Sequence, residues 1–396
     1  MPELRISPVR RAGKVIIRFL SALLTILFVL VVAICTAIWV LVKGPSPTAQ
    51  RLFVMSVRET SAVGWLANIF LSEAEIDKII GATEPYTEFH ETDTSLITLP
   101  AARPARSEAA ALEDAAEGIL PSDKETTDAD TDTAAAIDAG AAANGDTDAG
   151  ASADAGANAD ASIDADQEAD LDGIELHEVS GAGYVGYMLV VRDPLRVFVG
   201  TPDYLGGSGV RLMDMMNRTG AIAGINAGGF YDPDGTSSGG IPDGLVICDG
   251  TLKWGAGSGY VNVIGFDADG ILHVGTMTPS AAMDLGLQWA VSFGPTLISN
   301  GVAQDKESVR SGINPRTAIG QRSDGAVLLL VVDGRQIHSL GATYEDLIEI
   351  FLDFGAVNAA NLDGGSSTLM ILEGDIINSC ASVAGPRTIP TAFLVR

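Results

Sequence analysis

The stretch RTAIGQRSDGAVLLLVVDGR, residues 316–335, contains two apolar runs separated by Ser323-Asp324-Gly325. Short runs rich in branched aliphatic residues favour β-strands, and an Asp-Gly pair between two such runs is typical of a hairpin turn. The stretch therefore predicts two neighbouring antiparallel strands. Asp267-Ala268-Asp269-Gly270 indicates a second hairpin turn of the same kind.

Similar runs, separated by Gly, Asp and Pro, recur through the C-terminal half of the chain. They span residues 184–191, 196–200, 221–226, 244–248, 261–266, 271–275, 290–294, 316–320, 326–332, 356–362 and 391–395. Two helices are expected among them. One covers about Gly209 to Asn217, and the other begins after a Thr343 and Asp346 cap and ends at Gly355. Many strands with few helices predict a mixed α/β (α+β) fold, a single mixed-sheet domain over residues 173–396.

The N-terminus has the pattern of a membrane anchor. Basic residues precede an uncharged run of 24 residues from Phe19 to Val42. A helix of that length spans ~36 Å, enough to cross a bilayer, whereas the apolar region of a cleaved signal peptide is usually ~7–15 residues long. We therefore expect a single-pass plasma-membrane protein with residues 1–18 in the cytoplasm, a transmembrane helix over 19–42 and an extracytoplasmic remainder.

Two segments are expected between the anchor and the domain. Residues 43–100 are predicted to be a helical juxtamembrane segment, in which Ser72 and Glu75 form a capping box. Residues 101–172 are predicted to be a disordered, Ala- and Asp-rich linker, because so few apolar residues cannot offset the entropy of ordering the chain. From Pro121 to Asp172 there are 15 acidic residues and one lysine, so this stretch carries −14 of the formal charge of −27. Such a charge argues against a nucleic-acid partner.

The cysteines leave two interpretations open. Cys35 lies in the anchor run, and Cys248 and Cys380 lie in the part expected to be outside the cell. A disulfide between the latter two would persist there, and burial as two small apolar side chains is the alternative.

Three clusters place polar residues and glycines beside strand-like runs: INAGGFYDPDG at 225–235, INPRTAIG at 313–320 and NLDGGSSTLM at 361–370. Ligand sites commonly form at strand ends, where side chains project into a crevice and the backbone stays rigid. The glycine pairs in the first and third clusters permit close approach of backbone N–H groups to phosphate or sugar oxygens, and ordinary tight turns use the same pairs.

Two charged residues in these clusters suit chemistry. Arg316 offers planar, bidentate donation to a phosphate. Asp363 suits a general acid or base, a nucleophile, a metal ligand or a turn cap. Asp333 is a weaker case, because Asp-Gly after an apolar run is also the usual way to leave a strand.

Other kinds of site have little support in the sequence. The Asp232 to Gly235 loop lacks the third acidic position and the glutamate of an EF-hand. The four histidines show no metal-ligand spacing, and the sequence predicts no G-x-S-x-G elbow, the strand–turn–helix unit of serine hydrolases. Carboxylate chemistry is therefore the favoured hypothesis.

Five motifs in order, AGINAGGF, SFGPTLISNG, NPRTAIG, LLLVVDGRQ and NLDGGSSTLM, resemble the phosphodiester glycosidase family. The resemblance covers about residues 183–396, and the anchor with the juxtamembrane segment resembles the front end of bacterial, exopolysaccharide-related members. The family signature is commonly Asp-Gly-Gly-Gly-Ser, and Ser366 stands here where the third glycine would be.

The resemblance implies hydrolysis of sugar-1-phosphodiester bonds of cell-envelope or exopolysaccharide glycans, an activity like that of an N-acetylglucosamine-1-phosphodiester alpha-N-acetylglucosaminidase. The expected catalytic residues are Asp363, Arg316 and, in reserve, Asp333. The expected substrate-binding residues are Asn226, Gly228, Gly229, Phe230, Thr317, Asn361, Gly364, Gly365 and Ser366. No cofactor is implied with certainty, and the need for a divalent metal stays open.

Two other functions remain as alternatives to hydrolysis. A non-catalytic module of the same fold that binds glycans or the cell envelope uses the same strand ends, because a fold does not fix a function. A structural, membrane-tethered protein is the third alternative, in which the acidic segment serves as a spacer.

Overall fold

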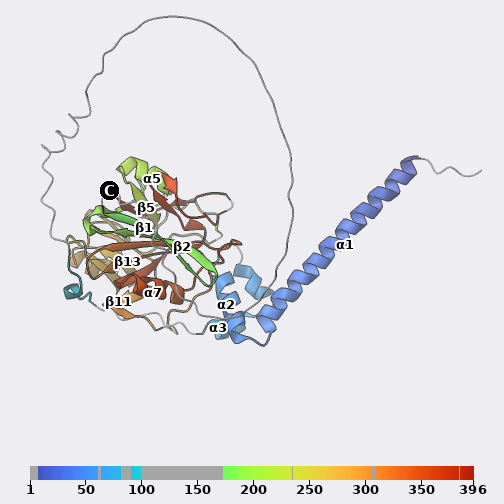
Figure 1. The fold of residues 1–396 in the computed structure, drawn as a ribbon, viewed down its shortest axis with the longest axis horizontal. Coiled ribbons are helices and arrows are strands. Elements are labelled where there is room, and N and C mark those ends of the chain that lie inside the picture. Colours follow the sequence, from blue (N-terminus) through green and yellow to red (C-terminus); the bar gives the residue numbers. More distant parts are fainter. Residues whose placement is uncertain are drawn as a thin grey trace, which may run out of the picture. The chain divides into compact units, whose positions relative to one another are not determined.

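A seven-stranded antiparallel sheet runs through the domain in the order β1-β2-β14-β13-β15-β11-β12. The computed structural model describes residues 8–60, 64–81, 91–99, 173–233, 235–305, 308–382 and 384–396 (Figure 1). The strands of this sheet are β1 (Ile174–Gly181), β2 (Tyr184–Val191), β11 (Thr296–Ser299), β12 (Val302–Ala303), β13 (Arg316–Arg322), β14 (Val327–Val332) and β15 (Ala356–Leu362).

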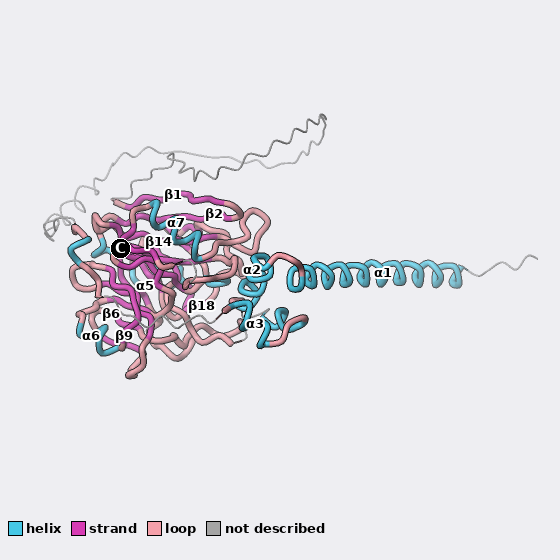
Figure 2. Tube along the Cα trace, turned by 90° about the horizontal axis from the view of Figure 1, so that it is seen from below, coloured by secondary structure: helices cyan, strands magenta, loops and turns pink. Residues whose placement is uncertain are grey.

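Two five-stranded sheets and a small two-stranded sheet complete the strand framework, and strands outweigh helices in the domain (Figure 2). One five-stranded sheet has the order β7-β6-β10-β8-β9, with β6 (Val246–Cys248), β7 (Thr251–Trp254), β8 (Val261–Phe266), β9 (Leu272–Met277) and β10 (Trp289–Val291). The other has the order β17-β16-β5-β19-β3, with β3 (Val197–Gly200), β5 (Ala223–Asn226), β16 (Met370–Leu372), β17 (Asp375–Ile376) and β19 (Ala392–Val395). β4 (Val210–Arg211) pairs with β18 (Thr388–Ile389).

The central sheet is buried on both faces, which explains its continuous apolar runs. Successive side chains of a strand point to opposite faces. Ile319 and Leu329 therefore join a core shared with Ile225 of β5 and other residues of the five-stranded sheets. Their neighbours Ala318 and Leu328 join a second core with helix α7.

Three short helices cover the sheets. α6 (Pro279–Asp284) packs by β6, β8 and β10, and α7 (Tyr344–Asp353) covers the second face of the central sheet. In α7, Thr343 and Asp346 form the predicted capping box, and Gly355 follows the helix with φ +77°. The helix expected from Gly209 begins later, at Leu212, because Val210 and Arg211 are extended and pair with β18; α5 spans Leu212–Thr219.

The predicted fold class is confirmed as a mixed α+β domain made mostly of sheets with few helices. Both hairpin turns lie where they are expected, since the Gly270 N–H donates to Asp267 O and the Gly325 N–H donates to Arg322 O. β1 was not predicted, although it pairs with β2 along all eight of its residues.

Helix α1 (Pro8–Lys43) contains the predicted membrane run. Its residues Ile17–Lys43 are long and apolar enough to cross a membrane, and the helix lies near the N-terminus. After it come α2 (Pro47–Arg58), η1 (Gly64–Ile69) and α3 (Glu73–Ile80), which lie within the predicted juxtamembrane segment. Ser72 and Glu75 form the capping box of α3. The predicted linker over 101–172 lies outside the described residues.

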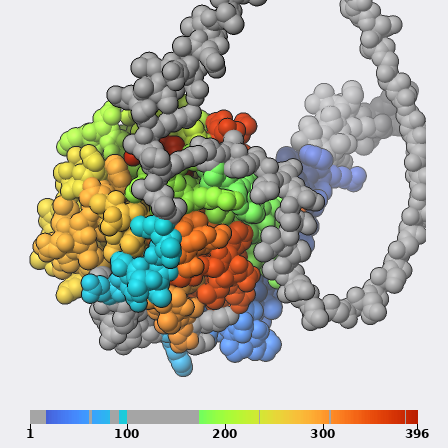
Figure 3. All heavy atoms as spheres, turned by 60° about the vertical axis from the view of Figure 1, so that its left-hand side comes forward, coloured from blue at the N-terminus to red at the C-terminus, as the bar shows by residue number. Residues whose placement is uncertain are grey.

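Residues 91–99, which contain the 3-10 helix η2 (Thr94–Leu96), lie on the surface of the domain (Figure 3). The Thr98 N–H donates to Ser323 O in the β13–β14 turn, and the Asp93 N–H donates to Asn300 Oδ1. The juxtamembrane segment and the domain belong to one compact unit, Met1–Leu99 with Ala161–Arg396.

We expect Phe351→Ala to lower the free energy of unfolding by about 3–5 kcal/mol, because truncating a buried aromatic side chain leaves a cavity. Phe351 is fully buried in the core between α7 and the central sheet. Leu352→Ala on the same helix is the control, since Leu352 is 46% exposed and its truncation should change stability by less than ~0.5 kcal/mol. Urea unfolding of the full chain measures both, and equal effects would contradict the packing described for α7.

Candidate active site

Antiparallel pairing brings the sequence clusters to one edge of the central sheet. Arg316, the first residue of β13, lies opposite Val332, the last residue of β14. Thr317 lies opposite Leu362, the last residue of β15. The chain segments that leave β14 and β15 therefore start beside Arg316, although they are separated by 30 residues in the sequence.

The side chain of Asn226 joins this edge to the end of β5. Asn226 is 1% exposed, and its Nδ2 donates to Asp363 O at 2.5 Å. Its Oδ1 accepts from Thr317 Oγ1 at 2.8 Å and from the Leu369 N–H at 3.0 Å. One buried amide thus fixes the positions of three segments that carry the candidate site.

The turn after β15 is held on both sides and requires its two glycines. The Asp363 N–H donates to Ala227 O, and the Gly365 N–H donates to Pro315 O, both at 2.9 Å. A Cβ at Gly364 would lie 2.7 Å from Pro315 O, which is too close for any side chain. Gly365 has φ +62°, the left-handed region that glycine adopts without strain.

A cavity of about 780 Å³ lies over this edge. It is lined by residues from the turn, from the loops after β5 and after β14, from the C-terminal segment and from the end of α2. These include Glu59, Thr60, Phe230, Asp232, Phe293, Asn314, Arg316, Arg335, Tyr344, Asn361, Asp363, Gly364, Gly365, Ser366, Ser367 and Arg387. Its size is within the range of ~300–1,000 Å³ that is usual for small-molecule sites.

Three arginines and three carboxyl groups line the cavity, and two of the arginines are paired. Arg316 Nη2 lies 2.8 Å from Glu59 Oε2, and Arg387 Nη1 lies 2.7 Å from Asp232 Oδ2. Burial alone raises the pKa of Asp232, but the hydrogen bonds from Arg387 and the Ser237 N–H outweigh it and hold that pKa below its usual value. The Asp232 carboxylate is therefore ionised at neutral pH.

Arg335 is the third arginine, and its partners are neutral. Its Nη2 donates to Thr60 Oγ1 at 2.7 Å and to Asn314 Oδ1 at 2.9 Å. The guanidinium lies over Gly365: a Cβ added at this glycine would be 3.4 Å from Arg335 Nη2. Burial lowers the pKa of Arg335, with a further contribution from Arg316, yet an arginine stays charged in proteins. A cation whose hydrogen-bond partners are neutral attracts an anion to this side of the cavity.

Asp363 is the titratable group in the cavity that changes charge near neutral pH. Burial raises its pKa to about 7, although Ser367 and Arg387 act in the opposite direction. Its Oδ2 atom is shielded from solvent and has no hydrogen-bond partner among the described residues. A carboxyl group with a pKa near the working pH is suited to giving or taking a proton.

Residues 219–396 match the family model described as phosphodiester glycosidase. This segment belongs to that family. A 198-residue stretch is 34% identical to the SPbeta prophage-derived uncharacterized protein YomE of Bacillus subtilis, covering 47% of this chain and 29% of that protein. A 219-residue stretch is 28% identical to the mouse N-acetylglucosamine-1-phosphodiester alpha-N-acetylglucosaminidase, covering 50% of this chain and 41% of the mouse protein.

The fold is also similar to a solved structure. The zebrafish N-acetylglucosamine-1-phosphodiester alpha-N-acetylglucosaminidase catalytic domain, auto-inhibited by its pro-peptide, aligns with a TM-score of 0.50 and 22% identity. The alignment covers 60% of this chain and 87% of that one, and it establishes the fold alone. The chain spans less than half the length of each curated relative described above.

The phosphodiester glycosidase domain gathers many of the predicted site residues at the cavity. Its lining includes Phe230, Arg316, Asn361, Asp363, Gly364, Gly365 and Ser366. Asn361 Nδ2 donates to Gly294 O at 2.8 Å, while its Oδ1 is buried without a partner among the described residues. That oxygen is suited to accept a hydrogen bond from a bound hydroxyl group.

Four predicted residues are not part of the cavity lining: Asn226, Thr317, Gly228 and Gly229. Thr317 is fully buried and donates to Asn226. The Gly228 N–H donates to Thr391 Oγ1, and the Gly229 N–H donates to Ser292 O. Both glycine amides are thus bonded within the fold, so we leave them out of the substrate contacts proposed below.

Asp333 also lies outside the cavity lining. It is 1% exposed, and its Oδ1 accepts from Asn378 Nδ2 at 3.1 Å and from the Ser379 N–H at 2.9 Å. His338 Nε2 is 3.2 Å from its Oδ2. These contacts tie the β14 exit to residues 378–379, so we leave Asp333 out of the catalytic set proposed below.

Several cavity residues were not predicted. Asp232 and Arg335 lie within two of the sequence motifs, INAGGFYDPDG and LLLVVDGRQ. Their place in these motifs is the sequence feature that could have identified them as site residues. Arg387 and Glu59 carry no local signal, because only the folded chain brings them to the cavity.

The described part of the chain bears on two features that the sequence leaves open, a metal site and a disulfide. Among its residues there is no group of three or more His, Cys, Asp or Glu side chains placed to hold a metal ion. Cys248 is buried in the core between the sheets, Cys380 packs against a different core, and both are free thiols.

The raised pKa of Asp363 predicts that Asp363→Asn will become more stable relative to the wild type as the pH rises from about 4 to about 7. The folded wild type keeps its proton in this interval while the unfolded chain loses it, so stability falls with rising pH by at most ~1.4 kcal/mol per unit. The variant has no carboxyl group at this position, so its stability lacks this dependence on pH. Urea unfolding of both proteins at pH 5, 6, 7 and 8 measures the difference, and a constant difference over this range would refute the raised pKa.

Proposed function

We propose that the domain hydrolyses sugar-1-phosphodiester bonds and that the cavity over the β13–β15 edge is its active site. The observation that carries the proposal is the combination, in one cavity, of a carboxyl group with a pKa of about 7 and an arginine without a carboxylate partner among the described residues. The family of the domain supports the reaction class, and the activity for which the mouse relative is named supports an N-acetylglucosamine-type sugar.

Arg335 binds the phosphate in this proposal. Its guanidinium lies beside the Gly364-Gly365 turn, so an anion seated there contacts both the cation and the turn that carries Asp363. Charge-assisted hydrogen bonds from arginine are stronger than neutral ones. Arg316 was the phosphate ligand expected from the sequence, but its guanidinium is already bound by Glu59 and by two backbone oxygens, Gly312 O and Ala342 O.

Asp363 acts as the general base. Water attacks C1 of the sugar, the bond between C1 and the phosphate oxygen breaks, and the departing phosphomonoester keeps the electron pair. Asp363 takes the proton of the attacking water. The phosphate is already a good leaving group, so stabilising the oxocarbenium-like sugar and the departing phosphate matters more than acid assistance. The ionised Asp232 contributes negative charge to the same cavity.

The cavity walls suit a sugar. Phe230, Phe293 and Tyr344 provide aromatic surfaces for the apolar faces of a sugar ring, and Ser366 and Asn361 provide polar groups for its hydroxyls. Sites for small ligands commonly combine apolar walls with a few polar groups that fix orientation.

We also propose the location that the sequence predicts: the domain is anchored by α1 and works outside the plasma membrane on cell-envelope glycans. The apolar length of α1 supports the anchor. The role in exopolysaccharide metabolism rests on resemblance to bacterial members alone.

Hydrolysis is tested with the full chain in detergent, a panel of sugar-1-phosphodiesters and a measurement of released reducing sugar. Asp363→Asn should lower kcat by roughly 10²–10⁴-fold, because it removes the base. Arg335→Ala should raise KM on the order of 10- to 100-fold, because one charged hydrogen-bonding partner of the phosphate is lost. Asp375→Asn and Arg211→Ala, at exposed positions, are the matched controls and should leave both constants unchanged. Binding of these compounds without release by the wild type would favour the glycan-binding module instead.

The base role fixes the direction of the pH dependence. With a pKa of about 7 for Asp363, kcat/KM should rise roughly tenfold per pH unit below 7 and level off above it, since only the ionised carboxylate accepts a proton. A rate profile measured from pH 5 to 9 checks this. A fall in kcat/KM above pH 7 would show that Asp363 works as an acid.

A further inference from the structure

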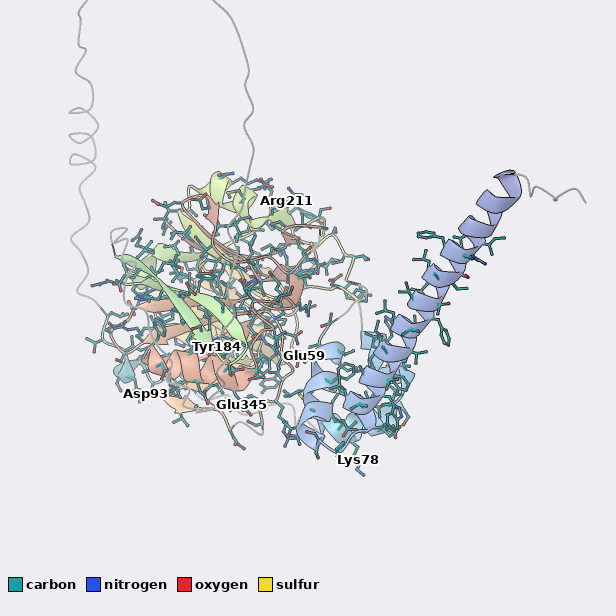
Figure 4. All side chains as sticks on the ribbon, turned by 45° about the vertical axis from the view of Figure 1, so that its right-hand side comes forward. Glu59, Lys78, Asp93, Tyr184, Arg211 and Glu345 are labelled. Carbon is teal, nitrogen blue, oxygen red and sulfur yellow. The ribbon has the colours of Figure 1, made fainter. Side chains whose placement is uncertain are left out.

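The end of the juxtamembrane helix α2 forms part of the cavity. Glu59, which follows Arg58 at the end of α2, and Thr60 both line it, and Figure 4 labels Glu59 at the end of this helix. The rest of the lining comes from residues beyond 229, more than 165 residues later in the chain. Neither the catalytic chemistry proposed above nor the family match over 219–396 assigns a role to this segment.

A single carboxylate binds the whole segment that enters β13. Glu59 Oε1 accepts from the Gly312 N–H at 2.7 Å, and Glu59 Oε2 accepts from Asn314 Nδ2 and from Arg316 Nη2, both at 2.8 Å. The side chain of Arg316 is only 6% exposed, so its positive charge is compensated by Glu59 rather than by solvent. Removing one member of a buried ion pair leaves the other charge uncompensated.

Two neighbours of Glu59 extend the contact. Ser56 Oγ accepts from the Ile313 N–H at 2.8 Å, and Thr60 Oγ1 accepts from Arg335 Nη2 at 2.7 Å. The second bond fixes the guanidinium that binds phosphate in the proposed reaction. A side chain at position 312 would overlap the backbone of Ser56, so the close approach of the helix requires Gly312.

The segment bound by α2 in turn supports the catalytic turn. Pro315 is the residue between Asn314 and Arg316, and its carbonyl oxygen accepts a hydrogen bond from the Gly365 N–H at 2.9 Å. A displacement of residues 312–316 therefore moves the turn that carries Asp363. Misplacement by about 1 Å can lower a rate ~10²-fold.

We propose that the juxtamembrane helix completes the active site and that Glu59 is a positioning residue, which holds residues 312–316 and, through Thr60 and Pro315, sets the places of Arg335 and Asp363. This inference rests on the proposed function. Glu59 touches no reacting atom in it. The opposite arrangement, in which Glu59 occupies the place of an anionic substrate and blocks it, makes the opposite kinetic prediction.

The test compares Glu59→Gln with the wild type in the full chain. Positioning predicts that kcat falls roughly 10- to 100-fold while KM stays equal or decreases, because one negative charge leaves a cavity for an anionic substrate. Glu59→Asp should restore part of the lost kcat. Glu73→Gln is the matched control: Glu73 lies on α3 of the same segment, is exposed, and bonds Asn68 and Arg58 rather than the domain. An unchanged or increased kcat in Glu59→Gln would overturn the proposal.

Gly312→Ala gives a second, independent variant that substitutes no residue of the cavity lining. Its added methyl group pushes α2 away, so its kcat should fall as in Glu59→Gln; a gain in activity would mean that α2 blocks the site. Hydrogen exchange at the Gly312 and Ile313 amides reads the docking without any substrate. If the wild type releases no sugar, the proposed function fails, but hydrogen exchange still tests whether α2 docks on the domain. Amides that are protected in the wild type and exposed in Gly312→Ala support docking. Unprotected amides in the wild type refute it.

Discussion

The buried side chain of Asn226 is the interaction on which the site depends. It stands at the end of β5, in one of the two sheets packed on the central sheet, and bonds β13, the turn after β15 and the segment before β16. All its polar atoms are used, and it is buried where an unpaired amide would be costly. The antiparallel register brings the strand ends together, and this amide then fixes the separation between the two sheets at the point where the cavity opens. The sequence predicts a substrate-binding role for it, and in the structure its side chain bonds the segments that carry the candidate site.

Charge in the cavity is arranged so that each ionisable group has a different environment. Arg316 and Arg387 are compensated by Glu59 and Asp232, whereas Arg335 has only neutral partners. Asp363 is left in surroundings that oppose its ionisation. The cavity thus holds two ion pairs, one arginine with neutral partners and one carboxyl group that titrates near neutral pH. This arrangement suits a substrate that carries one negative charge and a reaction that moves one proton.

Much of the strand framework could be predicted, because the central strands are buried on both faces and read as unbroken apolar runs. β1 escaped prediction for the opposite reason. It is an edge strand whose sequence, IELHEVSG, alternates polar and apolar residues without a long apolar run. Within the site, Asp333 and Asp363 show the limit of local patterns. Both follow an apolar strand and precede glycine, yet one is bound by Asn378 and Ser379 behind the cavity and the other lines it. Glu59 was beyond reach altogether, since the donors that surround it lie more than 250 residues away in the sequence.

The docking of α2 on the domain has a consequence for how the protein is held at its anchor. Hydrogen bonds and one ion pair join Glu59, Ser56 and Thr60 to residues 312–316 and Arg335, and further hydrogen bonds join Asp93 and Thr98 to the domain. Here both partners are parts of one polypeptide, so the contact forms at the effective concentration that the intervening chain imposes rather than at the concentration of the protein. A single proteolytic cut in residues 100–172 would leave every bond of the site intact and abolish that effective concentration. The domain would then be held to its anchor by these non-covalent contacts alone, and once they break it leaves the anchor and loses one wall of its cavity in the same event.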